Sequence, residues 1–182
     1  MSEPSIYEKA FAKTDKTDAI LVIEGKKMHV NKALLSYHSD YFNTLFNSEF
    51  KEKSMEEIEI KDVDFENFAT LLSLLQENQL NITTNRVVEL LNLADRFLLK
   101  GPKRQIEQLI GLADFYTKHE KLEIADKYHL ESLMEQILSL YNTPASFREL
   151  YSLKKWKSLS DATKLKISNR FFETYAFYLP SK

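Results

Sequence analysis

Residues 18–52 read DAILVIEGKKMHVNKALLSYHSDYFNTLFNSEFKE, and this stretch decides the fold of the first half of the chain. Residues 19–23 are aliphatic or β-branched and have charged residues on both sides, which is typical of a strand. Residues 26–30, after Glu24-Gly25, are predicted to form the returning strand of a hairpin. Glycine reaches the positive φ that a two-residue hairpin turn needs. The stretch therefore predicts a β-hairpin.

Two short helices are predicted after the hairpin. Asn31 and Ser39 favour N-cap positions, and the apolar residues that follow them at helical spacing are Leu34 and Leu35, then Phe42, Leu45 and Phe46. The run ends on Phe50, between Glu49 and Lys51. Phe50 either folds back over the core or points outward as an anchor for a partner, because aromatic residues carry much of the binding energy at interfaces. The local sequence leaves both alternatives open.

The composition indicates a well-packed, mainly helical chain that forms one sizeable domain or two small ones sharing a core. The chain has 182 residues, of which 43% are hydrophobic and 12% aromatic, so a sizeable core can form. Only three glycines and four prolines occur, which is too little turn chemistry for a sheet-rich fold.

Charge and residue usage exclude several classes of partner and compartment. A net charge of −2 argues against nucleic acid as a main ligand, and no apolar run approaches the ~20 residues of a membrane span. The absence of cysteine excludes disulfides, zinc fingers and thiol nucleophiles. Residues 1–18 are too polar for a signal peptide, so a reducing intracellular compartment is expected.

The sequence carries no enzyme motif. Nucleotide-binding glycine loops, a nucleophile elbow and a zinc-binding H-E-x-x-H are all missing. Of the four histidines, His119 and His129 are ten residues apart and do not share a helical face as metal ligands would. We therefore expect no catalytic residue, no metal site and no cofactor.

Further elements follow from local patterns on either side of the opening stretch. Residues 1–17 are polar and are expected to be flexible, or ordered only against a partner. Residues 55–60 alternate acids with isoleucine and predict a third strand, after which Asp64 caps an amphipathic helix. A later helix carrying residues 87–98 is predicted to end at Gly101-Pro102, where the next helix is predicted to start with proline in its first turn.

An internal repeat occupies the second half of the chain. Residues 91–97 (LNLADRF) match residues 122–128 (LEIADKY), so two similar helical hairpins are expected. Beyond Tyr141, Thr143 and Ser160 are predicted to cap two more helices, and the apolar residues assigned to the last one are Leu165, Phe171 and Phe172. For the tyrosine- and phenylalanine-rich residues after it, we expect packing within the last helices.

The order of these motifs resembles the BTB (POZ) domain family over residues 18–110. The matching motifs are D-x-I-L-V, G-K-K-x-x-V-x-K-x-x-L, S-x-Y-F-x-x-L-F, F-K-E, I-x-I-x-D-V-x-x-x-x-F and L-L-x-L-A-D-R-F. The following I-A-D-K-Y-x-L-x-x-L and W-K-S-L are similar to the helical 3-box/BACK extension of substrate adaptors. The sequence as a whole looks like the BTB parts of nematode BTB and MATH-BTB proteins.

The resemblance implies an α+β fold, a small mixed sheet capped by helices, followed by an all-α extension. The domains expected are an N-terminal arm over 1–17, the BTB domain over 18–111 and the extension over 112–182. In the family an apolar-x-Glu tripeptide and a neighbouring helix bind the N-terminal domain of cullin-3. These positions fall here on Phe50, Lys51 and Glu52 and on Tyr41, Asn43 and Thr44, and the paired dimer positions fall on Asp18 and Lys32.

The function implied is that of a non-enzymatic cullin-3 adaptor that self-associates and brings a protein client, whose identity is unknown, to a ubiquitin ligase. The alternative is a BTB oligomerisation scaffold, transcriptional or cytoskeletal, that does not bind the cullin. The expected location is the cytoplasm, with the nucleus also open.

The chain departs from the family pattern in three places. Asn31 stands where the family commonly has His, and the short arm implies that the helix exchanged in many BTB dimers is absent or reduced. No MATH, Kelch or zinc-finger segment is visible. Either the chain is part of a longer protein, or the arm and the C-terminal helices recruit the client.

Overall fold

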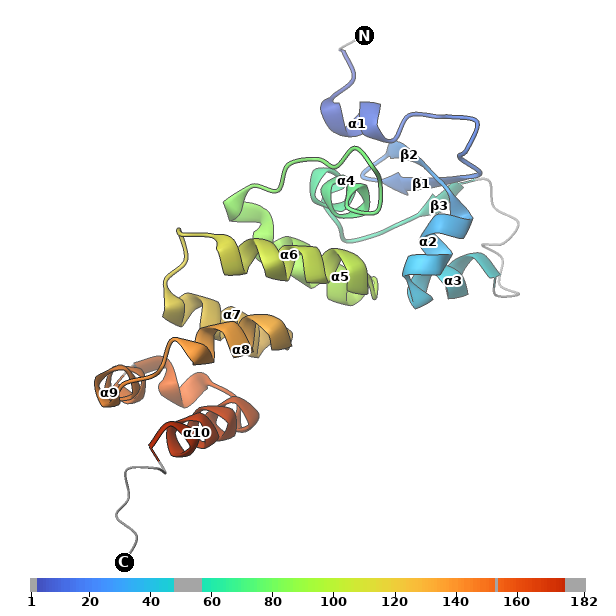
Figure 1. The fold of residues 1–182 in the computed structure, drawn as a ribbon. Helices are drawn as coiled ribbons and strands as arrows, with labels where there is room; N and C mark the ends of the chain where they lie inside the picture. Colours follow the sequence, from blue (N-terminus) through green and yellow to red (C-terminus); the bar gives the residue numbers. More distant parts are fainter. Residues whose placement is uncertain (1–2, 48–56, 153, 176–182) are drawn as a thin grey trace, which may run out of the picture. The chain divides into compact units, whose positions relative to one another are not determined.

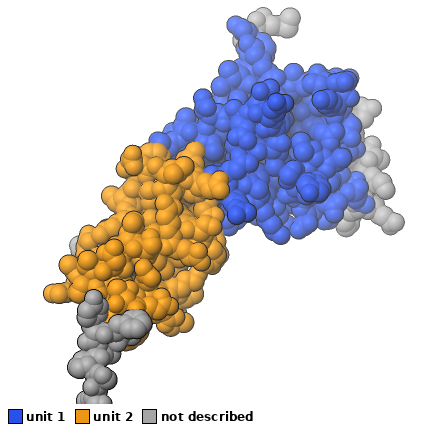
Figure 2. Space-filling view, viewed as in Figure 1, with its two compact units in different colours: residues 1–106 blue, residues 107–182 orange. Residues whose placement is uncertain are grey.

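The fold is described from a computed structural model, which covers residues 3–47, 57–152 and 154–175. The chain divides into two compact units, residues 1–106 and residues 107–182 (Figure 2). The division falls within helix α6 (Lys100–Leu112), whose last residues also contain the domain boundary predicted from the sequence.

The first unit combines a small sheet with helices, and the predicted α+β class is confirmed. Its elements in chain order (Figure 1) are α1 (Ile6–Ala10), β1 (Ala19–Ile23), β2 (Lys26–Val30), α2 (Lys32–His38), α3 (Asp40–Asn47), β3 (Glu57–Glu59), α4 (Phe65–Ser73), the 3₁₀ turn η2 (Thr84–Arg86), α5 (Val87–Arg96) and the first turns of α6.

The sheet has the strand order β2-β1-β3, with β1 in the centre. β1 pairs antiparallel with β2, where Leu21 lies opposite Met28, and parallel with β3, where Leu21 lies opposite Ile58. Glu24 and Gly25 both have positive φ, 50° and 74°, as a two-residue turn between twisted strands requires. The hairpin and the third strand were both predicted, and Ile58 is buried between two exposed glutamates.

The helices of the first unit begin where the capping residues predict. The Asn31 side chain accepts a hydrogen bond from the Leu34 amide, and the Asp64 side chain accepts one from the Asn67 amide. The Ser39 hydroxyl accepts from the Phe42 amide at 3.1 Å, so it caps α3. These local bonds satisfy amides that a helix start leaves unpaired.

An aromatic cluster centred on Phe97 holds α3 against α4 and α5. The Phe97 ring lies 5.8 Å from Phe42, 4.8 Å from Phe68 and 5.0 Å from Tyr41, all within the range of favourable ring contacts. The buried Ser39 hydroxyl donates to the Phe97 carbonyl at 2.6 Å. The start of α3 is therefore tied to the end of α5 by ring packing and by a hydrogen bond.

The predicted end of α5 at Gly101-Pro102 is wrong, because the helix ends at Arg96. Leu98 takes a left-handed conformation with φ 52°, and the Leu99 amide donates to the Ala94 carbonyl at 2.8 Å. This is a Schellman cap, which usually has glycine at the left-handed position. Gly101 and Pro102 lie in the first turn of α6, and the predicted place of proline in the first turn of this helix is confirmed.

The arm, predicted to be flexible or ordered only against a partner, packs on its own unit instead. It contains α1, which begins with a capping box between Ser5 and Glu8. Phe11 is buried at 2% exposure, and its carbonyl accepts from the His29 amide of β2. The polar composition of the arm did not reveal this packing, because the residues that order the arm lie far away in the sequence.

The second unit is entirely helical in its described residues. After the end of α6 its elements are α7 (Lys118–Tyr128), α8 (Glu131–Ser139), α9 (Pro144–Ser152), the 3₁₀ turn η3 (Lys154–Ser158) and α10 (Asp161–Tyr175). Thr143 and Ser160 cap α9 and α10 as predicted, through the Ser146 and Thr163 amides.

The internal repeat extends to backbone geometry. His129, at the position equivalent to Leu98, has the same φ of 52°, and the Leu130 amide donates to the Ala125 carbonyl at 2.9 Å. Leu99 and Leu130 are both buried next to these turns. The same sequence pattern therefore produces the same Schellman cap in both hairpins.

The predicted apolar side of α10 is partly wrong. Leu165 and Phe172 are 61% and 62% exposed, whereas Ile167 is fully buried and Phe171 packs on Phe147. Tyr175 lies 6.2 Å from Phe147, but the remaining tail residues, 176–182, lie outside the described part of the chain.

We predict that Phe97→Ala lowers the free energy of unfolding by about 3–5 kcal/mol, because it opens a cavity at the centre of the aromatic cluster. Urea denaturation followed by circular dichroism measures this. The control is Val88→Ala on α5, the helix that Phe97 follows, where the side chain is 39% exposed and a loss below about 1 kcal/mol is expected. Similar losses for the two variants would contradict the assigned role of Phe97.

Candidate functional site: a protein-interaction face on α3

The outer face of α3 is a polar, exposed strip. Asn43 and Thr44, both predicted to bind a partner, are exposed on this helix together with Asp40 and Asn47. The Asn47 amide group donates to the Asn43 side-chain oxygen at 2.8 Å, and the Thr44 hydroxyl donates to the Asp40 carbonyl at 2.9 Å. The strip therefore offers ordered hydrogen-bonding groups at the surface.

Tyr41, the third predicted residue on α3, lies at the flank of this strip. It is partly buried, and its ring packs edge-on against Phe42 at 5.2 Å and Phe97 at 5.0 Å. Tyr41 therefore links the exposed strip to the aromatic cluster below it. Phe50, Lys51 and Glu52, the other predicted contacts, lie outside the described residues.

Asp18 and Lys32, the predicted dimer pair, are brought together within one chain. The Asp18 carboxylate accepts a hydrogen bond from the Lys32 backbone amide at 2.7 Å. The Lys32 ammonium lies 5.9 Å from the centre of the Phe46 ring, within cation–π range. The pair thus joins the start of β1 to the start of α2 and leaves the Asp18 side chain at the surface.

An exposed aromatic residue on the neighbouring helix α2 was missed by the sequence interpretation. Tyr37, near the end of α2, is 85% exposed, and its ring makes an edge contact with His38 at 5.0 Å. α2 and α3 lie side by side (Figure 1). The helical period contains the signal, because Tyr37 follows the buried Leu35 by two positions and so points to the opposite side.

The second unit contains a hydrogen-bonded cluster that the sequence spacing did not reveal. The buried Tyr141 hydroxyl bonds His119 Nδ1 at 2.9 Å, and His119 Nε2 bonds Glu149 at 3.0 Å. Lys118 donates to the same carboxylate at 2.7 Å. Burial raises the pKa of Tyr141 to about 12, so its hydroxyl keeps its proton at neutral pH.

This cluster acts as a clamp between α7 and α9. The Lys118 ammonium, followed by the His119 imidazole, lowers the pKa of the Glu149 carboxyl through their hydrogen bonds. A buried tyrosine with a raised pKa is a poor nucleophile, and a hydrogen-bond chain of this kind stabilises a helix contact.

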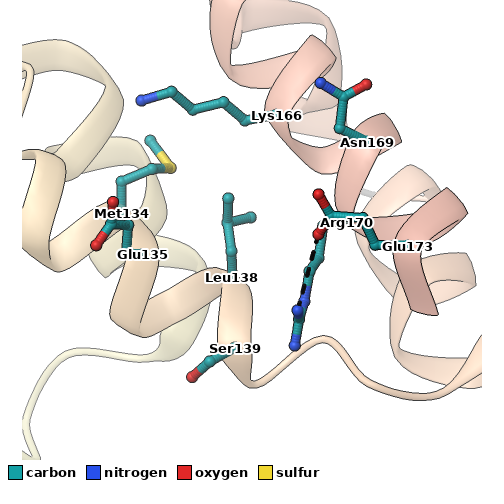
Figure 3. A pocket seen from close by; sticks show the side chains of 8 residues that line it. All are labelled: Met134, Glu135, Leu138, Ser139, Lys166, Asn169, Arg170 and Glu173. Atoms are coloured by element: carbon teal, nitrogen blue, oxygen red, sulfur yellow. Dashed lines mark ion pairs between the residues drawn. The ribbon is translucent and has the colours of Figure 1, made fainter.

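A groove of about 450 Å³ lies between α8 and α10 (Figure 3). Met134 and Leu138 contribute its apolar side, and Lys166, Arg170 and Glu173 line it from α10. Arg170 lies 4.0 Å from Glu173, and Lys166 pairs with a glutamate at the start of α8. Each of these two cations therefore has an acidic partner in the same unit.

Within the described residues, no group of three or more histidine, aspartate or glutamate side chains could hold a metal ion. None of the helices in that part of the chain is both long and apolar enough to cross a membrane.

Comparison with known proteins identifies the first unit. The family model for the BTB/POZ domain matches residues 7–111. BTB and MATH domain-containing protein 36 of Caenorhabditis elegans is 34% identical over 147 residues, covering 81% of this chain and 46% of that protein. Protein 38 of the same series and organism is 30% identical over 158 residues, covering 87% of this chain and 41% of that protein.

The BTB domain of human Gigaxonin, a solved structure, aligns with a TM-score of 0.46 and 21% identity, covering 60% of this chain and 96% of that chain. The chain spans about half the length of the curated relatives it matches.

We predict that the stabilising effect of Glu149 depends on pH. Because the folded-state pKa is lowered, the effect is present above the ordinary carboxyl pKa and is lost as pH falls through the lowered value. Urea denaturation of the native chain and of Glu149→Gln, from pH 6 downward, should give two stabilities that converge in acid. Glu135→Gln, an exposed glutamate of α8, is the control. A difference for Glu149→Gln that stays constant down to the lowest pH would contradict the clamp.

Proposed function

The chain belongs to the BTB/POZ domain family, and from that premise we propose that it is a cullin-3 adaptor that self-associates and brings a protein client to a ubiquitin ligase. The BTB domain is a protein-interaction fold, so protein–protein interaction is its general activity. The cullin, the second copy and the client are the specific partners proposed here.

The exposed strip on α3 is the observation that carries the cullin assignment. Asn43 and Thr44 lie on it with their polar groups ordered, and Tyr41 anchors it to the buried rings. The Phe50-Lys51-Glu52 tripeptide follows the end of α3 within a few residues. The two predicted cullin contacts, α3 and the tripeptide, therefore belong to one stretch of the sequence. Aromatic anchors surrounded by polar contacts are typical of binding hot spots.

The proposal assigns different roles to the two parts of the chain. The BTB domain, over residues 18–111, would bind the cullin and a second copy, and the helical extension over 112–182 would support the complex. The Asp18 carboxylate and the Lys32 ammonium are proposed to lie at the contact with the second copy. Such an adaptor would work in the cytoplasm, with the nucleus as the other compartment considered.

The alternative is an oligomerisation scaffold that does not bind a cullin. A scaffold would leave the α3 strip in contact with solvent, as polar groups are on surfaces that bind no partner. Cullin binding is therefore the property that separates the two functions.

We predict that the intact chain binds the isolated cullin-3 N-terminal domain in calorimetry, and that Phe50→Ala weakens binding about 30-fold, as loss of a hot-spot residue of about 2 kcal/mol does. Thr44→Arg should abolish binding without changing the unfolding midpoint, because it places bulk and charge on the strip. Phe172→Ala is the matched control, since this exposed aromatic residue lies on α10.

No heat of binding for the intact chain would contradict the adaptor function and favour the scaffold. Binding by the native chain that Phe50→Ala and Thr44→Arg leave unchanged would contradict the assigned surface.

We predict that the chain is a dimer by multi-angle light scattering and that Lys32→Glu raises the dimer dissociation constant at least ~10-fold, because it brings like charges together at the contact. Lys13→Glu makes the same charge change at an exposed position of the arm and should leave the dimer intact. A monomeric native chain, or equal effects of the two substitutions, would contradict the assigned dimer contact.

A further inference from the structure

The N-terminal arm is anchored to its own unit at two points. The Phe11 ring is 2% exposed, and the Phe11 carbonyl accepts from the His29 amide at 3.0 Å on the outer edge of β2. Asp18 accepts from the Lys32 amide at the other end of the loop. Residues 12–17 therefore run between two fixed points.

A third contact holds α1 itself. Arg86 donates to the Tyr7 hydroxyl at 3.3 Å, and its guanidinium carbon lies 5.7 Å from the centre of the Tyr7 ring. Arg86 also pairs with Glu66 of α4 at 2.5 Å. α1 has only five residues, far fewer than a helix needs to persist alone in water, so it depends on these contacts.

The loop between the anchors is folded back by a hydrogen-bonded turn, here called the turn latch and defined as Thr14–Thr17 with Asn31. The Thr14 amide donates to the Thr17 hydroxyl at 3.1 Å, and that hydroxyl donates to the Thr14 carbonyl at 2.9 Å. The Asn31 side-chain nitrogen donates to the Lys16 carbonyl at 2.7 Å. The Asn31 oxygen meanwhile caps α2. One asparagine thus joins the turn to the start of a helix.

Packing beneath the loop is loose. A groove of about 530 Å³ lies between the loop and the surface formed by β2, α2 and residues 76–78. The hydrogen bonds of the turn latch, rather than apolar packing, therefore fix the direction in which the arm leaves β1.

We propose that the turn latch keeps the arm on its own domain, so that two copies of this chain associate without exchanging their arms. The occupant of the arm site is the chain's own Tyr7–Phe11 segment, and the competing occupant is the same segment of a second copy. The part of this inference that concerns dimers rests on the proposed self-association, whereas the closed arm itself does not.

The turn decides between these occupants because all other contacts are equal. An exchanged arm would make the same Phe11, Tyr7 and His29 contacts with the partner, so those anchors favour neither arrangement. Only the connecting loop differs, since exchange requires residues 12–17 to open and extend. Opening loses the bonds that the turn latch makes.

Photo-crosslinking tests the proposal directly. The photoreactive residue p-benzoylphenylalanine replaces Tyr7, whose ring faces Arg86 in the closed arm. Chains labelled with ¹⁴N and ¹⁵N are unfolded together in urea, refolded as a 1:1 mixture and irradiated, and the crosslinked peptides are analysed by mass spectrometry. The closed arm predicts crosslinks to peptides near residue 86 in which both halves carry the same isotope.

A latch variant supplies the second readout. Asn31→Asp keeps an N-cap acceptor but removes the donor to Lys16, and Thr17→Val removes the hydroxyl of the turn at nearly constant volume. In this double variant the mixed-isotope fraction should rise toward about half, the statistical value for exchanged arms, or the crosslink yield should fall at least ~5-fold if the arm is released. Asn142→Asp, a matched change in the second unit, should behave like the native chain.

Mixed-isotope crosslinks in the otherwise native chain would overturn the proposal, and so would an unchanged pattern in the latch variant. Light scattering of the same samples reports self-association separately. A monomeric sample with same-isotope crosslinks would therefore contradict the dimer but support the closed arm.

Discussion

The packing of Phe97 is the constraint on which the first unit depends. Its ring contacts the Phe42 and Phe68 rings, and its carbonyl accepts a hydrogen bond from the buried Ser39 hydroxyl that also caps α3. One residue at the end of α5 therefore fixes where α3 begins and how that helix lies on the core. The exposed strip with Asn43 and Thr44 is a consequence of this buried arrangement, because Tyr41 connects the two.

The elements that could be predicted from the sequence are those whose causes are local. Asn31, Ser39 and Asp64 cap helices with amides three residues away, and Glu24-Gly25 forms its turn without help from the rest of the chain. The repeat was also visible, since buried residues recur at the same spacing in both hairpins. The resemblance to the family assigns Asn43 and Thr44 to a partner contact, which stays a prediction, and both residues are exposed on α3.

The features that were not predicted depend on distant partners or on strained backbone. α5 ends early because Leu98 adopts a left-handed conformation, which residue type alone does not favour. The arm is ordered because Tyr7 and Phe11 find partners at Arg86 and His29. The link from His119 to Tyr141 and Glu149 joins three different segments, so spacing along the chain could not reveal it.

We propose that the strip on α3 is the surface where the cullin binds. Hydrogen–deuterium exchange of the chain, with and without the cullin-3 N-terminal domain, tests it most directly because exchange reports on each segment separately. Cullin binding at this strip should slow exchange in residues 40–52 and leave exchange in α10 unchanged. Equal exchange of residues 40–52 in the two samples, or protection confined to α10, would contradict it.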